Sequence, residues 1–180
     1  ASLHVIGKDI LRFHAIYWPA FLLAANIKPP KRVFSHGWIL SGDEKMSKSK
    51  GNILNPLEII DTYGIDELRY YLMKEVSHGS DGNISLENLK RCINSDLANN
   101  YGNLCQRVFS FVKNNCQNKV IKTKNISDAD KKLIEQTKVL TRDLRKEMNN
   151  QNLNNYIKSV INISFLTNKY INDEEPWKLR

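Results

Sequence analysis

Cysteines are few in this sequence, and they form no recognisable pair. The 180 residues include three, Cys92, Cys105 and Cys116, and none belongs to a Cys-x-x-Cys motif. An odd number of separated thiols indicates neither a disulfide framework nor a zinc site. The pattern is typical of a reducing compartment, so we expect an intracellular, cytoplasmic protein.

Long apolar runs are also missing. The longest covers residues 15–25 and contains Pro19, and it reaches about half of the length that spans a bilayer. The first residues lack the basic segment followed by an apolar one that marks a secretion signal. We therefore expect a soluble protein without a membrane partner.

Acidic residues are outnumbered by basic ones. Lysine and arginine number 27 against 19 aspartate and glutamate, which gives a net charge of +8 at pH 7. Such an excess favours a polyanionic partner such as RNA. The alternative is a compositional bias, because lysine, asparagine and isoleucine are abundant throughout the chain. Charge alone does not decide between these two interpretations.

The first 41 residues have the pattern of a parallel α/β unit. Residues 3–7 form a short β-branched run ended by glycine, and residues 33–40 have the pattern of a second buried strand. Between them, apolar residues recur at helical spacing at Leu11, Ala15, Trp18 and Leu22. The order predicts a strand, a helix that Pro19 kinks or divides, and a parallel strand. Two strands are few for a parallel sheet, so we expect the chain to begin partway through its domain.

Residues 42–85 are expected to form a loop and a connector. A lysine-rich loop with flanking glycines runs from residue 41 to residue 55. Asn55 and Pro56 then open a helix, Glu58 is placed to complete a capping box, and Gly64 ends the helix. A second short helix begins near Asp66 and turns Leu68, Tyr71 and Leu72 inward, and residues 78–83 form a polar turn.

From residue 86 the pattern is helical almost to the end. The apolar residues expected along one stripe of the first long helix are Leu86, Leu89, Ile93, Leu97, Tyr101, Leu104, Val108 and Val112. A second helix begins at Ser127, with Asp130 in the capping-box position, and buries Leu133, Leu140, Leu144 and Met148. A third, from about residue 153 to residue 171, turns inward Tyr156, Ile157, Val160, Ile161, Ser164 and Phe165. Together they predict an antiparallel bundle.

The strongest chemical signal is the loop Lys45-Met46-Ser47-Lys48-Ser49, followed by Lys50-Gly51-Asn52. Mobile ammonium groups there can stabilise the charge that develops as a triphosphate loses pyrophosphate. The alternative is a solvated basic loop. The pentapeptide resembles the KMSKS signature of class I aminoacyl-tRNA synthetases, and residues 55–71 resemble the segment that follows it in the methionine, valine, leucine and isoleucine enzymes. The resemblance implies that Lys45 and Lys48 are catalytic residues that bind ATP.

The flanking segments resemble the methionyl-tRNA synthetase family more than the other three. These segments are Gly7-Lys8-Asp9-Ile10-Leu11-Arg12-Phe13-His14 and Tyr17-Trp18-Pro19-Ala20. The resemblance implies that Asp9 holds the ATP ribose, which suits a carboxylate beyond a strand's carboxyl end. The alternative is an ordinary helix N-cap. The resemblance also places Ile10 and His14, one helical turn apart, in the methionine pocket. The alternative for His14 is a polar residue packed on the helix without a binding role.

Further matches concern adenine and the anticodon. Gly37, Trp38 and Ile39 correspond to the turn whose backbone meets adenine in this family, and Gly37 permits close backbone approach. Asn99, Asn103 and Arg107 are spaced by four on the polar face of the first long helix, where such side chains can bond base edges. A solvated face is the alternative.

Two segments carry the anticodon resemblance. Asn103-Leu104-Cys105-Gln106-Arg107 resembles the methionyl anticodon-binding motif. Pro176-Trp177 resembles the family's second anticodon element, whose tryptophan stacks on a base. The alternative for Trp177 is a hydrophobic anchor for the tail.

The resemblance covers essentially the whole chain and implies an α/β plus all-α architecture. Residues 1–41 would be the second half of a Rossmann-type ATP-binding domain, residues 42–85 the KMSKS loop and connector, and residues 86–180 the helical anticodon-binding domain. The implied activity is that of a methionine–tRNA ligase, with methionine, ATP with magnesium, and methionine tRNA as its partners.

One family motif is missing. His4-Val5-Ile6-Gly7 lacks the second histidine of the HIGH motif, and the zinc-bearing insertion is absent. We therefore expect a carboxy-terminal fragment that is inactive alone. The alternatives are a fragment of a valine, leucine or isoleucine enzyme, and a non-catalytic tRNA-binding module.

Overall fold

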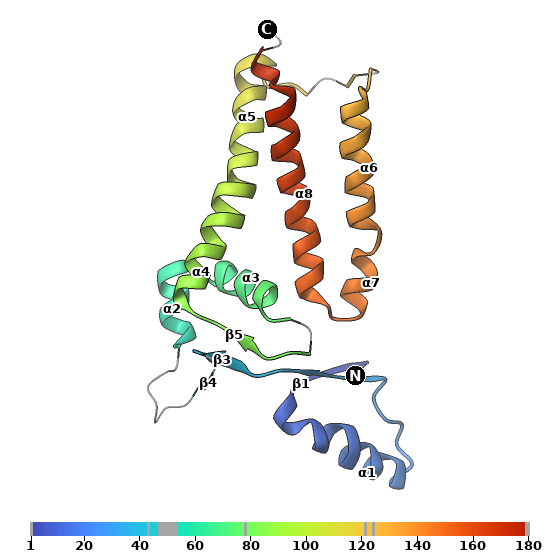
Figure 1. Cartoon of the computed structure of the whole chain (residues 1–180). Helices are drawn as coiled ribbons and strands as arrows, with labels where there is room; N and C mark the ends of the chain where they lie inside the picture. The colour runs from blue at the N-terminus through green and yellow to red at the C-terminus, as the bar shows by residue number, and fades with distance from the viewer. Residues whose placement is uncertain are drawn as a thin grey trace. The chain divides into compact units, whose positions relative to one another are not determined.

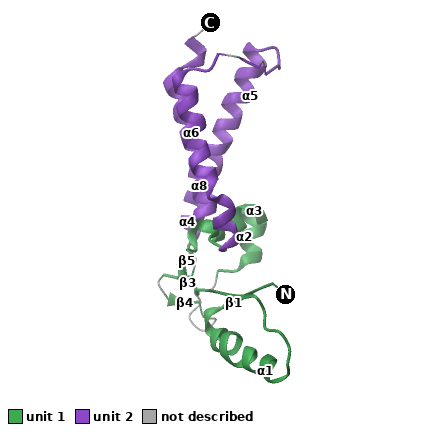
Figure 2. Cartoon of the chain, turned by 90° about the vertical axis from the view of Figure 1, so that its right-hand side faces the viewer, with its two compact units in different colours: residues 1–85, 151–154 green, residues 86–150, 155–180 purple. Residues whose placement is uncertain are grey.

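The computed structural model describes residues 2–42, 44–46, 54–77, 79–120, 122–123 and 125–178 (Figure 1). The chain divides into two compact units (Figure 2). The first contains residues 1–85 and 151–154, and the second contains residues 86–150 and 155–180. Among the described residues, no helix has both the length and the apolar character that crossing a membrane requires.

The first unit begins with a parallel strand pair. Strand β1 (Leu3–Gly7) lies beside β2 (Arg32–His36), with Leu3 opposite Arg32 and Gly7 opposite His36. A helical connection joins them through a 3₁₀ turn (Lys8–Ile10), a π-helical turn (Phe13–Tyr17) and helix α1 (Trp18–Ala24). This confirms the predicted strand–helix–strand unit, whose parallel strands place both carboxyl ends at the same edge.

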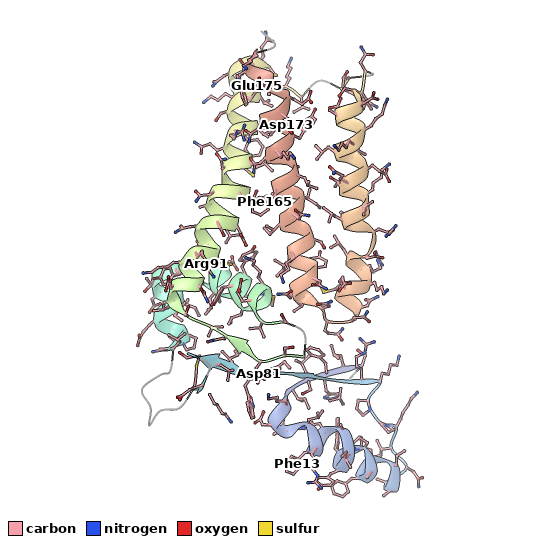
Figure 3. All side chains as sticks on the ribbon, viewed as in Figure 1. Phe13, Asp81, Arg91, Phe165, Asp173 and Glu175 are labelled. Atoms are coloured by element: carbon pink, nitrogen blue, oxygen red, sulfur yellow. The ribbon has the colours of Figure 1, made fainter. Side chains whose placement is uncertain are left out.

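Pro19 stands where the helical connection changes register. Proline has no N–H to donate to the carbonyl four residues earlier, and the turn before α1 is a π turn with wider spacing. The backbone stays helical through Pro19, so the segment changes from π to α turns there but is not divided in two. The predicted inward stripe is only half right: Trp18 and Leu22 are half-buried, whereas Leu11 and Ala15 are exposed. The π turn rotates the residues before it relative to those after it, and Phe13 within it is 58% exposed (Figure 3).

The second predicted strand, residues 33–40, is broken into two. Strand β2 ends at His36, and β3 (Ile39–Ser41) belongs to another sheet. In that sheet β3 pairs antiparallel with β4 (Glu44–Lys45) and parallel with β5 (Gly82–Asn83). The predicted polar turn at 78–83 is therefore wrong in its last residues. Two-residue strands have no readable periodicity, and the partner of β5 is distant in the chain.

The break occurs where the chain crosses itself closely. A Cβ added to Gly37 would lie 2.2 Å from the carbonyl oxygen of Ser80 and 2.5 Å from the nitrogen of Asp81. The Gly82 N–H donates to the Trp38 carbonyl at 2.8 Å, and the Ile84 N–H donates to Leu40 at 2.9 Å. Only glycine leaves room for this approach, because the obstructing atoms are backbone.

The connector contains α2 (Pro56–Tyr63) and α3 (Ile65–Glu75). Asn55 caps α2 by accepting from the Leu57 N–H at 3.1 Å. Its amide also donates to Glu58 at 2.8 Å, so the predicted capping box is replaced by a side-chain pair. Gly64 ends α2 with a φ of 102°, a backbone conformation that favours glycine.

Two inward residues predicted in α3 are confirmed. Leu68 and Tyr71 are buried, whereas Leu72 is half-buried. The Tyr71 hydroxyl accepts from the Ser85 N–H at 3.1 Å and donates to the Ser85 carbonyl at 3.3 Å. These two hydrogen bonds hold Ser85 against α3.

The second unit consists of helices. A long helical segment contains α4 (Leu86–Cys92), a π helix (Ile93–Gly102) and α5 (Asn103–Asn115). Helix α6 (Asp128–Arg142) and α7 (Leu144–Asn149) return in the opposite direction, and α8 (Leu153–Glu174) runs parallel to α5, followed by a 3₁₀ turn (Pro176–Lys178) (Figure 1). The three helical segments, α4 to α5, α6 to α7, and α8, thus alternate in direction, as predicted.

The π helix changes which residues of the long segment face inward. Asn100 is only 2% exposed and Asp96 is buried, whereas the predicted inward residue Tyr101 is 55% exposed. Val108 and Leu86 of the predicted stripe are also exposed. A continuous α helix would have kept the stripe, but the extra residue per turn of a π helix rotates the residues that follow. The prediction of one uninterrupted stripe is therefore wrong.

Helix α8 also departs from its predicted face. Val160 and Phe165 were expected inside but are exposed, and Ser164 is buried as predicted. The contact line instead follows Ile161, Ser164 and Asn168, because Asn100 donates to the Ile161 carbonyl and Asn168 donates to Asn100. Specific amide bonds thus set the rotation of α8, which apolar periodicity could not reveal.

Helix α6 begins as predicted, with a reciprocal capping box. Asp130 donates its N–H to the Ser127 hydroxyl at 3.1 Å and accepts from the Ser127 N–H at 2.7 Å. Tyr170 of α8 donates its hydroxyl to the same carboxylate, and this bond raises the pKa of Tyr170 to about 12. The predicted burial of Met148 is wrong, because the helix breaks at Asp143 and Met148 follows the break.

The crossing at Gly37 generates a stability prediction. We expect Gly37→Ala to lower the free energy of unfolding by about 1–3 kcal/mol, the usual effect of overpacking, because the added methyl group meets fixed backbone. Urea unfolding measures the change. Gly7→Ala is the matched control, because the one close approach of its Cβ would be to the movable Asp9 carboxylate, at 2.6 Å, and not to backbone. Equal losses for both variants would contradict the importance of the crossing.

Candidate functional site

The first group of predicted site residues lies at the carboxyl end of β1. Asp9 is exposed in the 3₁₀ turn, and its Oδ1 lies 2.6 Å from the position that a Gly7 Cβ would occupy. The missing side chain at Gly7 thus leaves space for this carboxylate. Gly7, rather than Asp9, occupies the N-cap position, so the ordinary N-cap interpretation of Asp9 is wrong. The carboxylate can accept hydrogen bonds from hydroxyl groups at the sheet edge.

His14 lies one turn after Ile10 and bonds to it. Its Nδ1 is 3.0 Å from the Ile10 carbonyl oxygen. Because a carbonyl only accepts, Nδ1 carries the proton, and Nε2 is the acceptor of the neutral ring. The His14 and Trp18 rings meet edge to face, with centroids 6.0 Å apart. Ile10 is 39% exposed, so this face presents an apolar side chain beside an imidazole of defined tautomer.

The backbone of the predicted adenine turn already bonds to residues 81 and 82 of the chain. The Trp38 N–H donates to Asp81 Oδ1 at 2.8 Å, and the Trp38 carbonyl accepts from Gly82. The Gly37 carbonyl lies 2.8 Å from His36 Nδ1. Ile39 is exposed. A nucleotide at this turn would therefore have to use atoms other than the Trp38 N–H.

Lys45 lies beside the Trp38 ring. Its Nζ is 4.7 Å from the ring centroid, and Lys8 Nζ is 4.0 Å from the same centroid. Both distances are within the range of a cation–π interaction. Lys48 and its neighbours at 47–53 lie outside the described residues, so the structure places only the first lysine of the predicted catalytic pair.

Sequence reasoning missed Lys8 and Asp81. Lys8 Nζ lies 2.6 Å from Asp81 Oδ1 and 2.7 Å from Oδ2, and Asp81 precedes β5 (Figure 3). The Lys8 ammonium, followed by the Trp38 N–H, lowers the pKa of the Asp81 carboxyl below its ordinary 3.8. No local signal distinguished Asp81, because the two partners are more than seventy residues apart.

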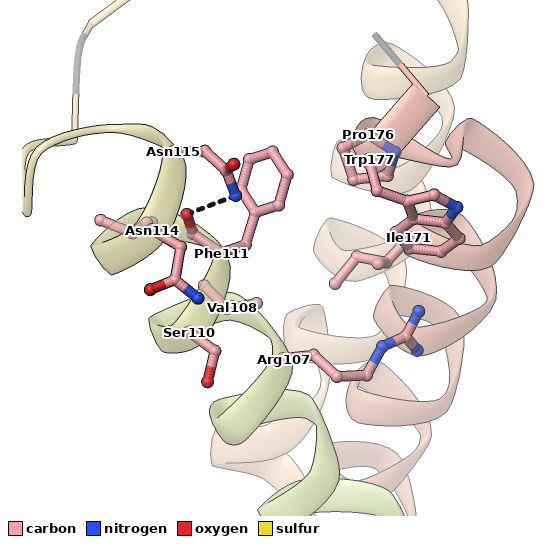
Figure 4. Close-up of a pocket in the computed structure, with 10 residues that line it drawn as sticks. Arg107, Val108, Ser110, Phe111, Asn114, Asn115, Ile171, Pro176 and Trp177 are labelled. Atoms are coloured by element: carbon pink, nitrogen blue, oxygen red, sulfur yellow. Dashed lines mark hydrogen bonds between the residues drawn. The ribbon is translucent and has the colours of Figure 1, made fainter. Parts of the chain in front are cut away.

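A second group of predicted site residues lies in the helical unit. The Arg107 guanidinium carbon is 5.7 Å from the centre of the Trp177 ring. Its Nη2 donates to Asn172 at 2.7 Å and its Nη1 donates to Asn168 at 3.3 Å. The close-up in Figure 4 shows Arg107 reaching from α5 toward Trp177 and Ile171. Asn168 and Asn172, one turn apart on α8, were not singled out from the sequence.

This arginine and tryptophan border a cavity of about 370 Å³. Phe111, Ile171 and Pro176 are among its other lining residues (Figure 4). Trp177 is 44% exposed, which is incompatible with a fully buried anchor for the tail. The combination of an exposed indole, a cation and an apolar hollow suits the stacking of a flat, electron-rich ring beside a negatively charged backbone.

Asn99 and Asn103 stand apart from this cavity. Both are exposed, and neither is among the residues that line it. Asn99 lies in the π helix and Asn103 begins α5, so the regular spacing by four that joined them to Arg107 spans a change of helical register. The structure therefore brings together Arg107, Pro176 and Trp177, but not the two asparagines.

The comparison with known protein families places the chain among the class I tRNA synthetases. Within this class, the chain belongs to the family of tRNA synthetases class I (M), which matches residues 1–109.

The relatives named for methionine resemble the chain along its whole length. It is 46% identical over 180 residues to the methionine–tRNA ligase of Brucella suis, covering all of this chain and 35% of that protein. The corresponding ligase of Mycobacterium leprae is 42% identical over 180 residues, with 100% of this chain and 34% of that protein covered. The chain thus spans about a third of these curated relatives, 34–35% of their length.

Solved structures give the same result. Mycobacterium tuberculosis methionyl-tRNA synthetase, solved in complex with methionyl-adenylate, superimposes with a TM-score of 0.94 at 42% identity. The alignment covers 99% of this chain and 35% of that one. The free form of the Mycobacterium tuberculosis enzyme gives a TM-score of 0.88 at 37% identity, with 99% and 34% covered.

The Lys8–Asp81 pair generates a pH prediction. Because the pKa of Asp81 is lowered in the folded state, its stabilising effect is present above the unfolded pKa and is lost as the pH falls through the folded value. We expect wild type to be more stable than Asp81→Asn above about pH 4 and this difference to shrink on acidification. Urea midpoints measured from about pH 6 to about pH 3 test this. A difference that is constant with pH would contradict it.

Proposed function

We propose that the protein containing this chain is a methionine–tRNA ligase. Such an enzyme joins methionine to ATP, releases pyrophosphate, and transfers the methionyl group from the adenylate to the terminal ribose of methionine tRNA. The observation that carries the proposal is the 46% identity to a methionine–tRNA ligase along all 180 residues, through both units. A similarity confined to the lysine loop would have supported only the class.

The first unit would contribute to amino-acid activation. Residues 1–41 would be the second half of a Rossmann-type domain, followed at 42–85 by the KMSKS loop and connector. Asp9 would accept from ribose hydroxyls at the end of β1, and Gly37, Trp38 and Ile39 would border adenine. His14 lies beside the exposed Ile10, and this position supports a role for His14 in the methionine pocket. The apolar side chain of Ile10 suits the thioether of methionine.

Lys45 and Lys48 would act on the phosphates. An ammonium group adds most to the rate where it meets charge that develops only in the transition state, here on the departing pyrophosphate. Magnesium commonly accompanies ATP. Within the described residues, no group of three or more histidine, cysteine, aspartate or glutamate side chains could hold a metal ion. We therefore assign no residue to magnesium and no step to it.

The helical unit, residues 86–180, would bind the anticodon. Trp177 and Pro176 would provide the stacking surface, and Arg107 would pair with the backbone or a base edge beside it. Asn99 and Asn103 would contact RNA from the exposed face of the long helical segment. The exposed indole and the cavity beside it support this assignment, and the net charge of +8 suits a polyanionic ligand.

Two rivals make different predictions. A valine, leucine or isoleucine enzyme would activate one of those amino acids, and a non-catalytic tRNA-binding module would activate none. Amino-acid-dependent pyrophosphate exchange by the full-length protein, with each of the four amino acids, separates these possibilities. Exchange that depends on methionine supports the proposal, and its absence would overturn it.

The lysine loop yields a kinetic prediction. In the full-length protein, Lys48→Ala should slow adenylate formation about a hundredfold, as expected for loss of one preorganised donor, with little change in methionine affinity. A single-turnover measurement gives the rate. Lys31→Ala removes the same charge from an exposed position in the first unit and should leave the rate unchanged. An unchanged rate in Lys48→Ala would reduce the loop to a solvated basic segment.

Trp177 yields a binding prediction. If its indole stacks on an anticodon base, Trp177→Ala should weaken binding of methionine tRNA by about 1–3 kcal/mol and reduce discrimination against an anticodon-altered tRNA. The melting temperature should change little, because the ring is already 44% exposed. Phe109→Ala, which removes a 70% exposed aromatic ring from α5, is the matched control. A large stability loss with unchanged discrimination would eliminate the assignment.

A further inference from the structure

The Trp38 indole attracts two cations that the proposed roles leave unexplained. Lys8 and Lys45 approach the same ring, at 4.0 Å and 4.7 Å from its centroid. The indole nitrogen is buried, and within the described part of the chain it has no hydrogen-bond partner. The ring is therefore oriented by its backbone and its cationic neighbours rather than by a bond from its own N–H.

Two ammonium groups at one ring repel each other, and Asp81 counteracts this repulsion. Both of its oxygens lie on Lys8, at 2.6 Å and 2.7 Å. The same carboxylate accepts from the Trp38 N–H at 2.8 Å. Asp81 thus neutralises one of the two cations and also fixes the residue that carries the ring.

The backbone holds these groups in one small sheet. Lys45 lies opposite Leu40 in the β3–β4 pair, and Leu40 lies beside Asn83 in the β3–β5 pair. Asp81 immediately precedes β5, and the Ser80–Asp81 backbone rests against Gly37. Asp81, Trp38 and the first lysine of the loop are therefore positioned by the same strands.

We propose that Asp81 is a positioning residue for the lysine loop, acting through Lys8 and Trp38. By neutralising Lys8, it lets the same indole also hold the Lys45 ammonium at the base of the loop, ready for the phosphates of ATP. A phosphate attracts an ammonium group more strongly than an exposed aromatic face does, so Lys45 moves to the nucleotide when it arrives. The inference rests on the proposed ligase function.

Kinetics of the full-length protein test the role. Asp81→Asn keeps an oxygen that can accept from the Trp38 N–H but removes the charge that pairs with Lys8. We expect the KM for ATP in methionine-dependent pyrophosphate exchange to rise about two- to fivefold, the effect of losing one exposed cation–π contact. The KM for methionine should stay constant, and Asp81→Glu should restore the ATP value. Asp61→Asn, at an exposed carboxylate on α2, is the charge-matched control.

A double-mutant cycle separates positioning from a structural role. In a Lys8→Met background there is no second cation to neutralise, so Asp81→Asn should add little further increase in the KM for ATP. Additive effects, or equal increases for ATP and methionine, would overturn the proposal, because both indicate general damage to the site. An unchanged KM for ATP in Asp81→Asn would overturn it as well.

A spectroscopic measurement tests the contacts independently of activity. The protein is labelled with 5-fluorotryptophan, and the ¹⁹F signal that disappears in Trp38→Phe is assigned to Trp38. We expect this signal to shift in Lys45→Met, in Asp81→Asn, and in wild type on addition of inorganic pyrophosphate. If wild type shows no exchange with methionine, the ligase function fails while this measurement still reports on the contact. A Trp38 signal insensitive to Lys45→Met would overturn the positioning role itself.

Discussion

The close approach of residues 80–84 to the turn at Gly37 is the contact on which the first unit's site depends. It needs a position without a Cβ, because the Ser80 carbonyl oxygen would lie 2.2 Å from one. It brings Asp81 to the Trp38 N–H and lets β5 pair with β3. Without it, Lys8 and the Trp38 N–H would share no carboxylate, and the indole that Lys45 contacts would lose the bond that fixes its backbone.

A chain of amide bonds has the corresponding role in the helical unit. Buried Asn100 accepts from Asn168, Asn168 accepts from Arg107, and Arg107 lies beside Trp177. The chain begins inside the π helix, where the changed register turns Asn100 inward. A π-helical segment in a long helix often marks a functional region, and here it aligns α8 with the cavity next to Trp177.

Both candidate sites hold a cation on an indole. Lys45 lies beside Trp38, and Arg107 is held by Trp177 together with the amide oxygens of Asn168 and Asn172. Trp177 and the two asparagines are neutral, so they orient the Arg107 cation without cancelling its charge, whereas a carboxylate would compete with an incoming anion. This arrangement suits a ligand with phosphates, such as the backbone of RNA.

The sequence by itself determined the features that depend on neighbouring residues. The strand–helix–strand order, the Ser127–Asp130 cap and the inward Tyr71 follow from local periodicity and capping chemistry, and the family resemblance followed from contiguous motifs. The break at Gly37, the pairing of β5 with β3, the Lys8–Asp81 pair and the Asn168 and Asn172 contacts were decided only in the tertiary structure. They join residues forty to more than seventy positions apart, and the π register that exposes Tyr101 leaves no distinct apolar pattern in the sequence.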